Sequence, residues 1–344
     1  MSPLSHLVIG RVPHGRFAPP VQPAASAIAE AGADNTEIRS ILVPLDGTRH
    51  AEHALPHALA IARRNRAVLR IAQAYSYREE AASQDGVWSE DDPAGAIREP
   101  HEHYLQSVVQ RISRVHQVPV IASLLESDAP GRQLKELQAQ TDLTVLTSRR
   151  RGWLSRLCRE SMVDLLLDRA ERPVLLIRGY DAPADLTGHP LCRHVVLPLE
   201  EPQSVPRLIG HVQLLGGREP QLISLWPISE EAAFAANAWL SRSPEATGAE
   251  LPSARTTVVI ASRGHGGPST LANITGESDV DLIAVARPTG AREFSWAETS
   301  PSVEIARNAQ VPVLVLPSPP QVSDHPAPRE RMEPNLRASP EGRK

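Results

Sequence analysis

The sequence predicts an α/β protein made of two tandem domains, each with a parallel sheet. Apolar runs of strand length alternate with amphipathic segments, and this alternation calls for parallel strands joined by right-handed helical crossovers. The segment at 142–177 recurs at 281–316, because Asp142 and Asp281 each precede a serine by 19 positions and each serine precedes a proline by 12. A chain of 344 residues is long enough for two such domains.

The domain boundaries follow from changes in composition. Residues 1–37 are rich in Pro, Ala and Gly without sustained periodicity, and residues 319–344 carry many prolines and charges, so both ends are predicted to be disordered. The first domain is predicted at 38–180 and the second at 194–318. Residues 181–193 form the linker between them, because Gly, Pro and Asp gather there.

The first domain should begin with a buried strand at 41–45, which ends in the turn Asp46-Gly47-Thr48. Thr48 is suited to cap a helix over 49–64, where the apolar residues lie on one face. The following elements are a strand at 68–74, a polar segment through 95, a helix at 99–116 and a strand at 118–124. After a turn at 127–131 come a helix to about 140, a strand, a polar loop, a helix and a last strand at 174–177.

The second domain repeats this order with strands at 195–199, 222–226 and 257–261, and Gly216-Gly217 should stop its first helix. The glycine-rich turn at 262–267 has two interpretations. It resembles a phosphate-binding loop, in which backbone N–H groups converge on an anion. Its register places it after the third strand instead, which favours a simple turn.

Composition excludes several classes of function. The net charge of −4 and the pI near 6.4 give no reason to expect nucleic acid or an acidic membrane as partner. No apolar run approaches the length that crosses a bilayer, and two cysteines, Cys158 and Cys192, cannot build a disulfide framework or thiolate cluster, so we expect a cytoplasmic protein. Only Lys135 and Lys344 are lysines, which argues against lysine-dependent chemistry and the Walker-type phosphate loop.

Three histidines form a stripe on the first helix. His50, His53 and His57 are spaced by three and four residues on a face other than the apolar one, a pattern that a metal ion could use. The simpler interpretation is a solvated stripe opposite the core, since no carboxylate partner is evident. We therefore predict no metal site.

The motif from Val43 to Thr48 (VPLDGT), together with the segment from Asp142 to Val174, closely resembles the universal stress protein family. The resemblance covers about 40–178 and, less closely, 194–317. It implies two doubly wound domains with five-stranded parallel sheets, of the Rossmann-like, adenine nucleotide alpha hydrolase-like class. Some members of that family bind ATP and others do not.

ATP-binding members hold adenosine through an Asp after the first strand, and Asp46, two residues after Pro44, matches this position. Their phosphate loop has the form G-x2-G-x9-G-[ST]. Here Thr147, Arg150 and Glu160 stand at the glycine positions and only Ser161 agrees, so side chains obstruct the close approach of backbone to phosphate.

The second domain departs further, with Glu200 in place of the Asp and with Ala286, Thr289 and Thr299 at the glycine positions. Ser300 is retained there. Neither domain keeps the motif, so no cofactor is assigned, and ATP remains the candidate that the resemblance offers.

Arginines cluster in the first loop, where Arg149, Arg150 and Arg151 are followed by Arg156 and Arg159. Guanidinium groups bind phosphate bidentately and could replace the lost backbone contacts. The simpler alternative is a solvated basic loop. The candidate anion or nucleotide site therefore consists of the following residues: Pro44, Asp46, Thr147, Arg150, Arg151 and Ser161.

Three functions follow from these features. The first is a non-enzymatic stress-response protein that acts by binding a ligand or a protein partner through a degenerate nucleotide site. The alternative is an ATP-binding, weakly hydrolysing member that uses Asp46 and the arginine-rich loop. A hydrolase of a related fold would need a serine- and glycine-rich loop after the first strand, which 43–48 does not supply. We also expect the two repeats to pack through their last strands, 174–177 and 313–316, as an intramolecular pseudo-dimer.

Overall fold

The computed structural model covers the chain in segments. It describes residues 37–83, 93–148, 162–167, 170–188, 192–200, 204–216, 221–228, 232–234, 256–260, 279–287, 304 and 308–317. We call residues 37–188 the first half and residues 192–317 the second half. The predicted disordered ends, apart from residue 37, and the glycine-rich turn at 262–267 lie outside the described residues.

The first half alternates strands and helices as the sequence predicts. Its elements are β1 Ser40–Leu45, α1 Arg49–Glu52, α2 Ala54–Asn65, β2 Val68–Tyr75, α3 Tyr77–Ser83, α4 Pro93–Val115, β3 Val120–Glu126, α5 Pro130–Ala139, β4 Leu143–Ser148, α6 Met162–Leu167 and β5 Val174–Arg178. Strands β1, β4 and β5 consist almost entirely of buried residues, as expected for parallel strands with helices on both faces.

The described part of the second half repeats the strands of the first. Its elements are β6 His194–Leu199, α7 Val205–Gly216, β7 Gln221–Pro227, β8 Thr256–Ile260, β9 Leu282–Ala286 and β10 Val313–Leu316. Helix α7 buries one apolar face, including Leu208 and Val212, against the sheet.

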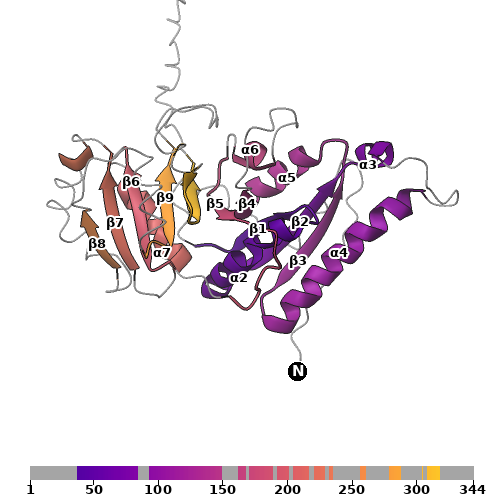
Figure 1. Ribbon diagram of the computed structural model, residues 1–344, viewed down its shortest axis with the longest axis horizontal. Coiled ribbons are helices and arrows are strands. Elements are labelled where there is room, and N and C mark those ends of the chain that lie inside the picture. The colour runs from indigo at the N-terminus through magenta and orange to yellow at the C-terminus, as the bar shows by residue number, and fades with distance from the viewer. Residues whose placement is uncertain are drawn as a thin grey trace, which may run out of the picture.

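All ten strands belong to one sheet, in the order β3-β2-β1-β4-β5-β10-β9-β6-β7-β8. Figure 1 shows them side by side, from β8 on the left to β3 on the right. Pairs within each half are parallel, whereas β5 and β10 pair antiparallel, with Leu175 opposite Leu314. The second half therefore repeats the strand order of the first in the opposite direction. Because the two sets of strands are antiparallel to each other, their carboxyl ends point in opposite directions.

The sequence predicts two five-stranded sheets, whereas the structure joins them into one sheet through β5 and β10. The strand pairs β1–β2, β1–β4, β2–β3 and β4–β5 give the first half five strands, but its last strand continues the ladder into the second half. Strands β5 and β10 are both buried, so leaving either as a free edge would expose apolar side chains and unpaired backbone groups. The single ten-stranded sheet removes both edges.

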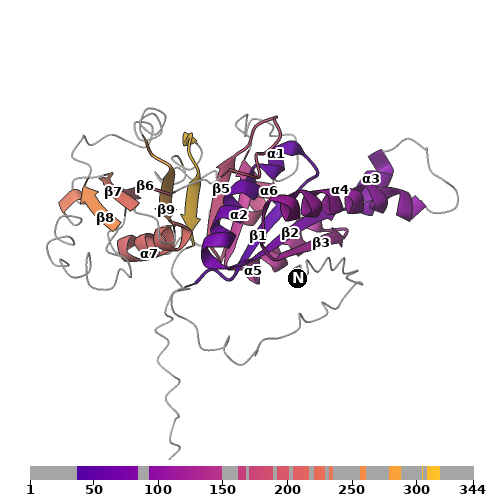
Figure 2. The ribbon, with the colours of Figure 1, turned by 90° about the horizontal axis from the view of Figure 1, so that it is seen from below.

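Helices cover the two faces of the sheet (Figure 2). One face packs under α2, α4 and α7 and holds the larger cluster, which includes Leu55, Ile112 and Leu208. The other face packs under α5 and α6 and includes Leu134 and Leu166. Each cluster runs across both halves, so the two halves share their hydrophobic core.

An aspartate at the start of the fourth strand anchors each half in the same way. The Oδ2 atom of Asp142 accepts hydrogen bonds from the N–H groups of Arg39 and Ser40, both at 2.9 Å. Asp281 accepts from the N–H groups of Arg193 and His194, at 2.9 and 3.0 Å. The residue that marks the sequence repeat thus ties the fourth strand to the beginning of the first strand.

Two local expectations are wrong. The single helix predicted at 49–64 is divided at His53, whose N–H bonds to the carbonyl of His50 in a tighter turn. The polar segment after β2 contains α3, and α4 begins at Pro93 rather than near 99. Polar contacts hold α3, because His101 on α4 bonds to the Glu80 carboxylate at 3.0 Å. The predicted cap is confirmed, since Thr48 Oγ1 accepts from the N–H of Ala51.

Candidate functional site

The candidate site lies where the strand order of the first half reverses. The chain continues from β1 to β2 and β3 on one side and returns to β4 and β5 on the other. Ligands of open α/β sheets bind in the crevice outside the carboxyl ends of the strands at such a point. Strands β1 and β4 pair only through Ile41 with Leu143 and Leu42 with Thr144, although both strands are six residues long. They are therefore unpaired towards their carboxyl ends.

A tight turn forms the β1 side of this crevice. Asp46 is exposed, and its Oδ1 accepts hydrogen bonds from the N–H of Thr48 at 2.9 Å and from its hydroxyl at 2.6 Å. Gly47 has φ +82°, which an L-residue rarely adopts. The turn therefore fixes the direction of the Asp46 carboxylate at the end of β1.

A second polar group lies at the carboxyl ends of β4 and β5, on the other side of the switch point from β2. Ser148 and Arg178 are paired in register, and Arg178 NH1 donates to Ser148 Oγ at 2.9 Å. Arg178 Nε also donates to the carbonyl of Ala309 in the second half at 2.8 Å. Two hydrogen bonds therefore hold this half-buried guanidinium in one direction.

An ion pair between a buried carboxylate and a half-buried guanidinium lies beside the Asp46 turn. Glu52 on α1 is 5% exposed, and its carboxylate lies 2.7 Å from the guanidinium of Arg111 on α4. Burial, and then the carboxylates of Glu52 and Asp46, raise the pKa of Tyr104. Arg111 therefore offsets the charge of Glu52, and Asp46 is the exposed carboxylate of this turn.

The structure describes three of the six predicted site residues. Pro44 is buried in β1 and paired with Ala72, Asp46 is in the turn, and Thr147 is half-buried near the end of β4. Arg150, Arg151 and Ser161 lie outside the described residues, as do the other loop positions discussed above: Arg149, Arg156, Arg159, Glu160, Thr289, Thr299 and Ser300.

Sequence reasoning missed Ser148 and Arg178 as candidate site residues. Arg178 follows an apolar strand and belongs to no motif. Its approach to Ser148 depends on the pairing of β4 with β5. The available signal was the position of each residue at the carboxyl end of a strand that was predicted to be parallel.

The corresponding place in the second half has different chemistry. Strands β6 and β9 pair only through Val195 with Leu282 and Val196 with Ile283, so they too are unpaired towards their carboxyl ends. Glu200 follows β6, and Arg287, 5% exposed, follows β9. The bulky Trp226 occupies the position that Ala72 has in the first half, because each pairs with the proline of the first strand of its half.

The histidine stripe makes contacts with residues that follow β5 and with the second half. The ring of His50 lies against Gly179, where an added Cβ would approach it to 2.7 Å. His53 Nε2 is 2.9 Å from the carbonyl of Ala182, and its ring meets that of Tyr180 edge-on. Among the described residues no group of three or more His, Cys, Asp or Glu could hold a metal ion. The expectation of a solvated stripe is therefore wrong, because these histidines pack on the connection between the halves.

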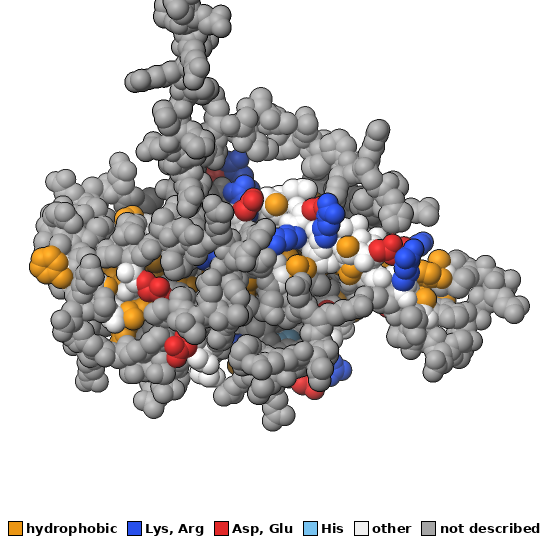
Figure 3. All heavy atoms as spheres, turned by 90° about the horizontal axis from the view of Figure 1, so that it is seen from above, with side chains coloured by type: hydrophobic (Ala, Val, Ile, Leu, Met, Phe, Trp, Pro, Cys, Tyr) orange, Lys and Arg blue, Asp and Glu red, His pale blue; other side chains and the backbone are white. Residues whose placement is uncertain are grey.

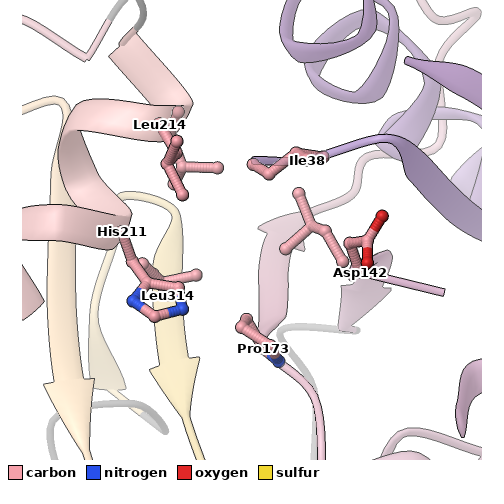
Figure 4. A pocket seen from close by; sticks show the side chains of 8 residues that line it. Ile38, Asp142, Pro173, His211, Leu214 and Leu314 are labelled. Atoms are coloured by element: carbon pink, nitrogen blue, oxygen red, sulfur yellow. The ribbon is translucent and has the colours of Figure 1, made fainter. Parts of the chain in front are cut away.

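Two small cavities lie on the boundary between the halves. One, of about 10 Å³, has His211 and Leu314 on one side and Ile38, Asp142 and Pro173 on the other (Figure 4). This volume is about enough for one water molecule, so the cavity is too small for a nucleotide.

The other cavity, of about 20 Å³, is lined by His57, Cys192 and Asp281 among others. Cysteine, histidine and aspartate together can form a nucleophilic site. Burial raises the pKa of the Cys192 thiol to about 11, so the thiol stays protonated at neutral pH and is a poor nucleophile.

Charges of both signs alternate on the face seen in Figure 3. Described Lys and Arg side chains lie beside Asp and Glu side chains over the first half, without a continuous patch of one sign among them. No helix in the described segments is long and apolar enough to span a membrane.

The doubly wound strand order of the first half, with its switch point between β1 and β4, defines a Rossmann-like α/β fold. Residues 37–178 match the model of the Universal stress protein family. The match spans the first half of the chain and includes strands β1 to β5. A search of curated proteins finds no match.

Three solved structures resemble most of the chain. A universal stress protein from Archaeoglobus fulgidus has a TM-score of 0.59 and 15% identity, covering 82% of this chain and 97% of its own. A functionally unknown protein from Pseudomonas aeruginosa has a TM-score of 0.53 and 16% identity, covering 83% of this chain and 94% of its own. A putative universal stress protein from the same species has a TM-score of 0.53 and 17% identity, covering 83% and 95%. At these identities the likeness is one of fold alone.

Proposed function

We propose that this protein is a stress-response protein that acts by binding, and that the crevice of the first half takes a phosphate-bearing ligand of the adenine nucleotide type. The observation that carries the proposal is the polarity of this crevice, with Asp46 fixed on the β1 side and Arg178 fixed on the β5 side. A carboxylate accepts hydrogen bonds from ribose hydroxyls, whereas a guanidinium attracts phosphate.

The direction of the ligand follows from these charges. The exposed Asp46 carboxylate would repel phosphate, so the sugar belongs on that side. The phosphates belong towards Arg178 and the arginine-rich segment that follows Ser148 in sequence. Thr147 in place of glycine keeps the backbone N–H groups farther from a phosphate. Arginine side chains therefore replace them as phosphate donors.

We favour binding over hydrolysis because the described side chains that could transfer a proton are already engaged in hydrogen bonds or protonated. Both ring nitrogens of His101 are engaged, one with Glu80 and the other with Gln73 at 2.8 Å. Asp46 Oδ1 is held by Thr48, and the thiol of Cys192 is protonated. The second half, with Glu200 and Trp226 at its crevice, serves as the structural partner.

The binding proposal is tested by calorimetric titration of the full chain with ATP and Mg²⁺, with ADP, AMP and cyclic AMP in parallel. Replacing Asp46 by alanine should weaken binding about 10- to 100-fold, because a charged hydrogen bond to the ligand is lost. Asp181→Ala, on an exposed residue after β5, is the matched control and should leave affinity unchanged. Wild-type protein that binds none of these nucleotides would contradict the proposal.

The proposed intramolecular pseudo-dimer predicts a monomer in solution. The antiparallel pairing of β5 with β10 and the reversed strand order of the second half support this arrangement, because the surface that a second chain would cover is already covered. Light scattering should give a mass near 37.4 kDa. A stable dimer or tetramer would contradict it.

A further inference from the structure

Each half donates a hydrogen bond from an arginine to a carbonyl at an equivalent position of the other half. Arg178 Nε, in the first half, donates to the carbonyl of Ala309 at 2.8 Å. Arg287 NH1, in the second half, donates to the carbonyl of Ala170 at 3.3 Å. Ala170 and Ala309 are equivalent positions, because each lies three residues before the proline that opens the last strand.

The two arginines themselves are not equivalent. Arg178 ends β5, whereas Arg287 follows β9 and stands at the position that Ser148 has in the first half. In the first half, Ser148 accepts from the same guanidinium that reaches Ala309, at 2.9 Å. The Arg178 side chain therefore joins Ser148, at the end of β4, to the second half.

The Arg178 bridge connects elements that a ligand and the sheet junction both use. Ser148 is the last residue of β4 on the crevice, and Ala309, 1% exposed, lies four residues before β10. Ala309 belongs to the core cluster under α5 and α6, as does Leu146, which points to the same face of β4 as Ser148. A planar guanidinium holds two acceptors in fixed directions, so a shift at one acceptor changes the bond at the other.

We propose that Arg178 is a positioning residue that couples occupancy of the first-half crevice to the stability of the second half, through its simultaneous bonds to Ser148 and Ala309. The inference rests on the proposed function for the identity of the ligand, a phosphate-bearing nucleotide. A nucleotide that orders Ser148 should therefore also protect the segment at 308–316.

Hydrogen–deuterium exchange of the full chain tests the bridge in two arms. Without nucleotide, Arg178→Gln should raise exchange about tenfold in peptides covering both 143–148 and 308–316, because two charge-assisted bonds are lost. Arg178→Lys should show wild-type exchange in at most one of the two segments. A flexible ammonium group does not hold two acceptors as the planar guanidinium does. Arg132→Gln, an exposed arginine on α5, is the control and should change neither segment.

With saturating ATP and Mg²⁺, wild type and Arg132→Gln should gain protection in both segments. Ser148→Ala removes the acceptor on β4, so it should lose the nucleotide-dependent protection at 308–316. Equal exchange of 308–316 in Arg178→Gln and wild type would overturn the inference. Protection confined to the first half of the wild type would also overturn it while leaving the proposed function intact. If nucleotide changes no peptide, the proposed function fails, and the nucleotide-free arm alone decides whether Arg178 bridges the halves.

Discussion

Replacing Leu314 by aspartate is expected to lower the free energy of unfolding by more than about 4 kcal/mol, because it places an unpaired charge inside a core. Leu314 is 1% exposed and sits at the centre of β10, between Leu175 of β5 and Ala284 of β9. Since folded proteins are stable by about 5–15 kcal/mol in total, the loss is a large share of that. Denaturant titration measures it.

Amide exchange in β5 of the Leu314→Asp variant tests whether the sheet is continuous between the two halves. If the sheet is continuous, Leu314→Asp should also raise amide exchange in β5, which belongs to the first half. Leu222→Asp, on β7, is the matched control: Leu222 is 36% exposed, so the charge stays in contact with water and the cost should be below about 1 kcal/mol. Unchanged exchange in β5 of Leu314→Asp would show that the two sets of strands are independent.

Acidification from pH 7.5 to pH 5 is expected to destabilise the protein by about 2 kcal/mol through His57 alone. Burial is the largest cause that lowers the pKa of His57 from 6.5 to about 4, followed by the charges of Arg64 and His53. His57 is therefore protonated below about pH 6.5 in the unfolded chain but only below about pH 4 in the folded chain. Stability falls as pH falls through this window, and the full loss of about 3 kcal/mol is reached below pH 4.

The comparison of variants isolates this contribution from other titrating groups. In His57→Gln the fall in unfolding free energy between pH 7.5 and pH 5 should be smaller by about 2 kcal/mol than in wild type. His103→Gln, on an exposed histidine of α4, should keep the wild-type dependence. The groups facing His57 are Arg64 and His53 on its own helix and Cys192 and Asp281 from the second half. A His57→Gln profile that parallels wild type would contradict the assignment.

The strands were predictable because their sequences are continuous apolar runs that end in turn residues. Asp46-Gly47-Thr48 after β1 is such a boundary, and both the turn and the Thr48 cap are found as expected. Helix α3 was missed because its segment, YREEAAS, is polar. A polar contact from Glu80 to His101 holds it in place, and that contact depends on where α4 lies.

The site was only partly predictable, for a similar reason. Asp46 is adjacent in sequence to the strand that positions it, so a motif can reveal it. Ser148 and Arg178 are 30 residues apart in sequence, and the register of β4 and β5 brings them together. The cross-half bond to Ala309 further requires the antiparallel junction. Arg150, Arg151 and Ser161 stay predictions from the sequence.

The binding crevice of the first half is tested most directly by a crystal structure of the full chain grown with ATP and Mg²⁺. We predict nucleotide density at the carboxyl ends of β1 and β4, with the ribose at Asp46 and the phosphates towards Arg178. Density in the second half alone, or a ligand with its phosphates beside Asp46 and Glu52, would contradict the proposed polarity of the site.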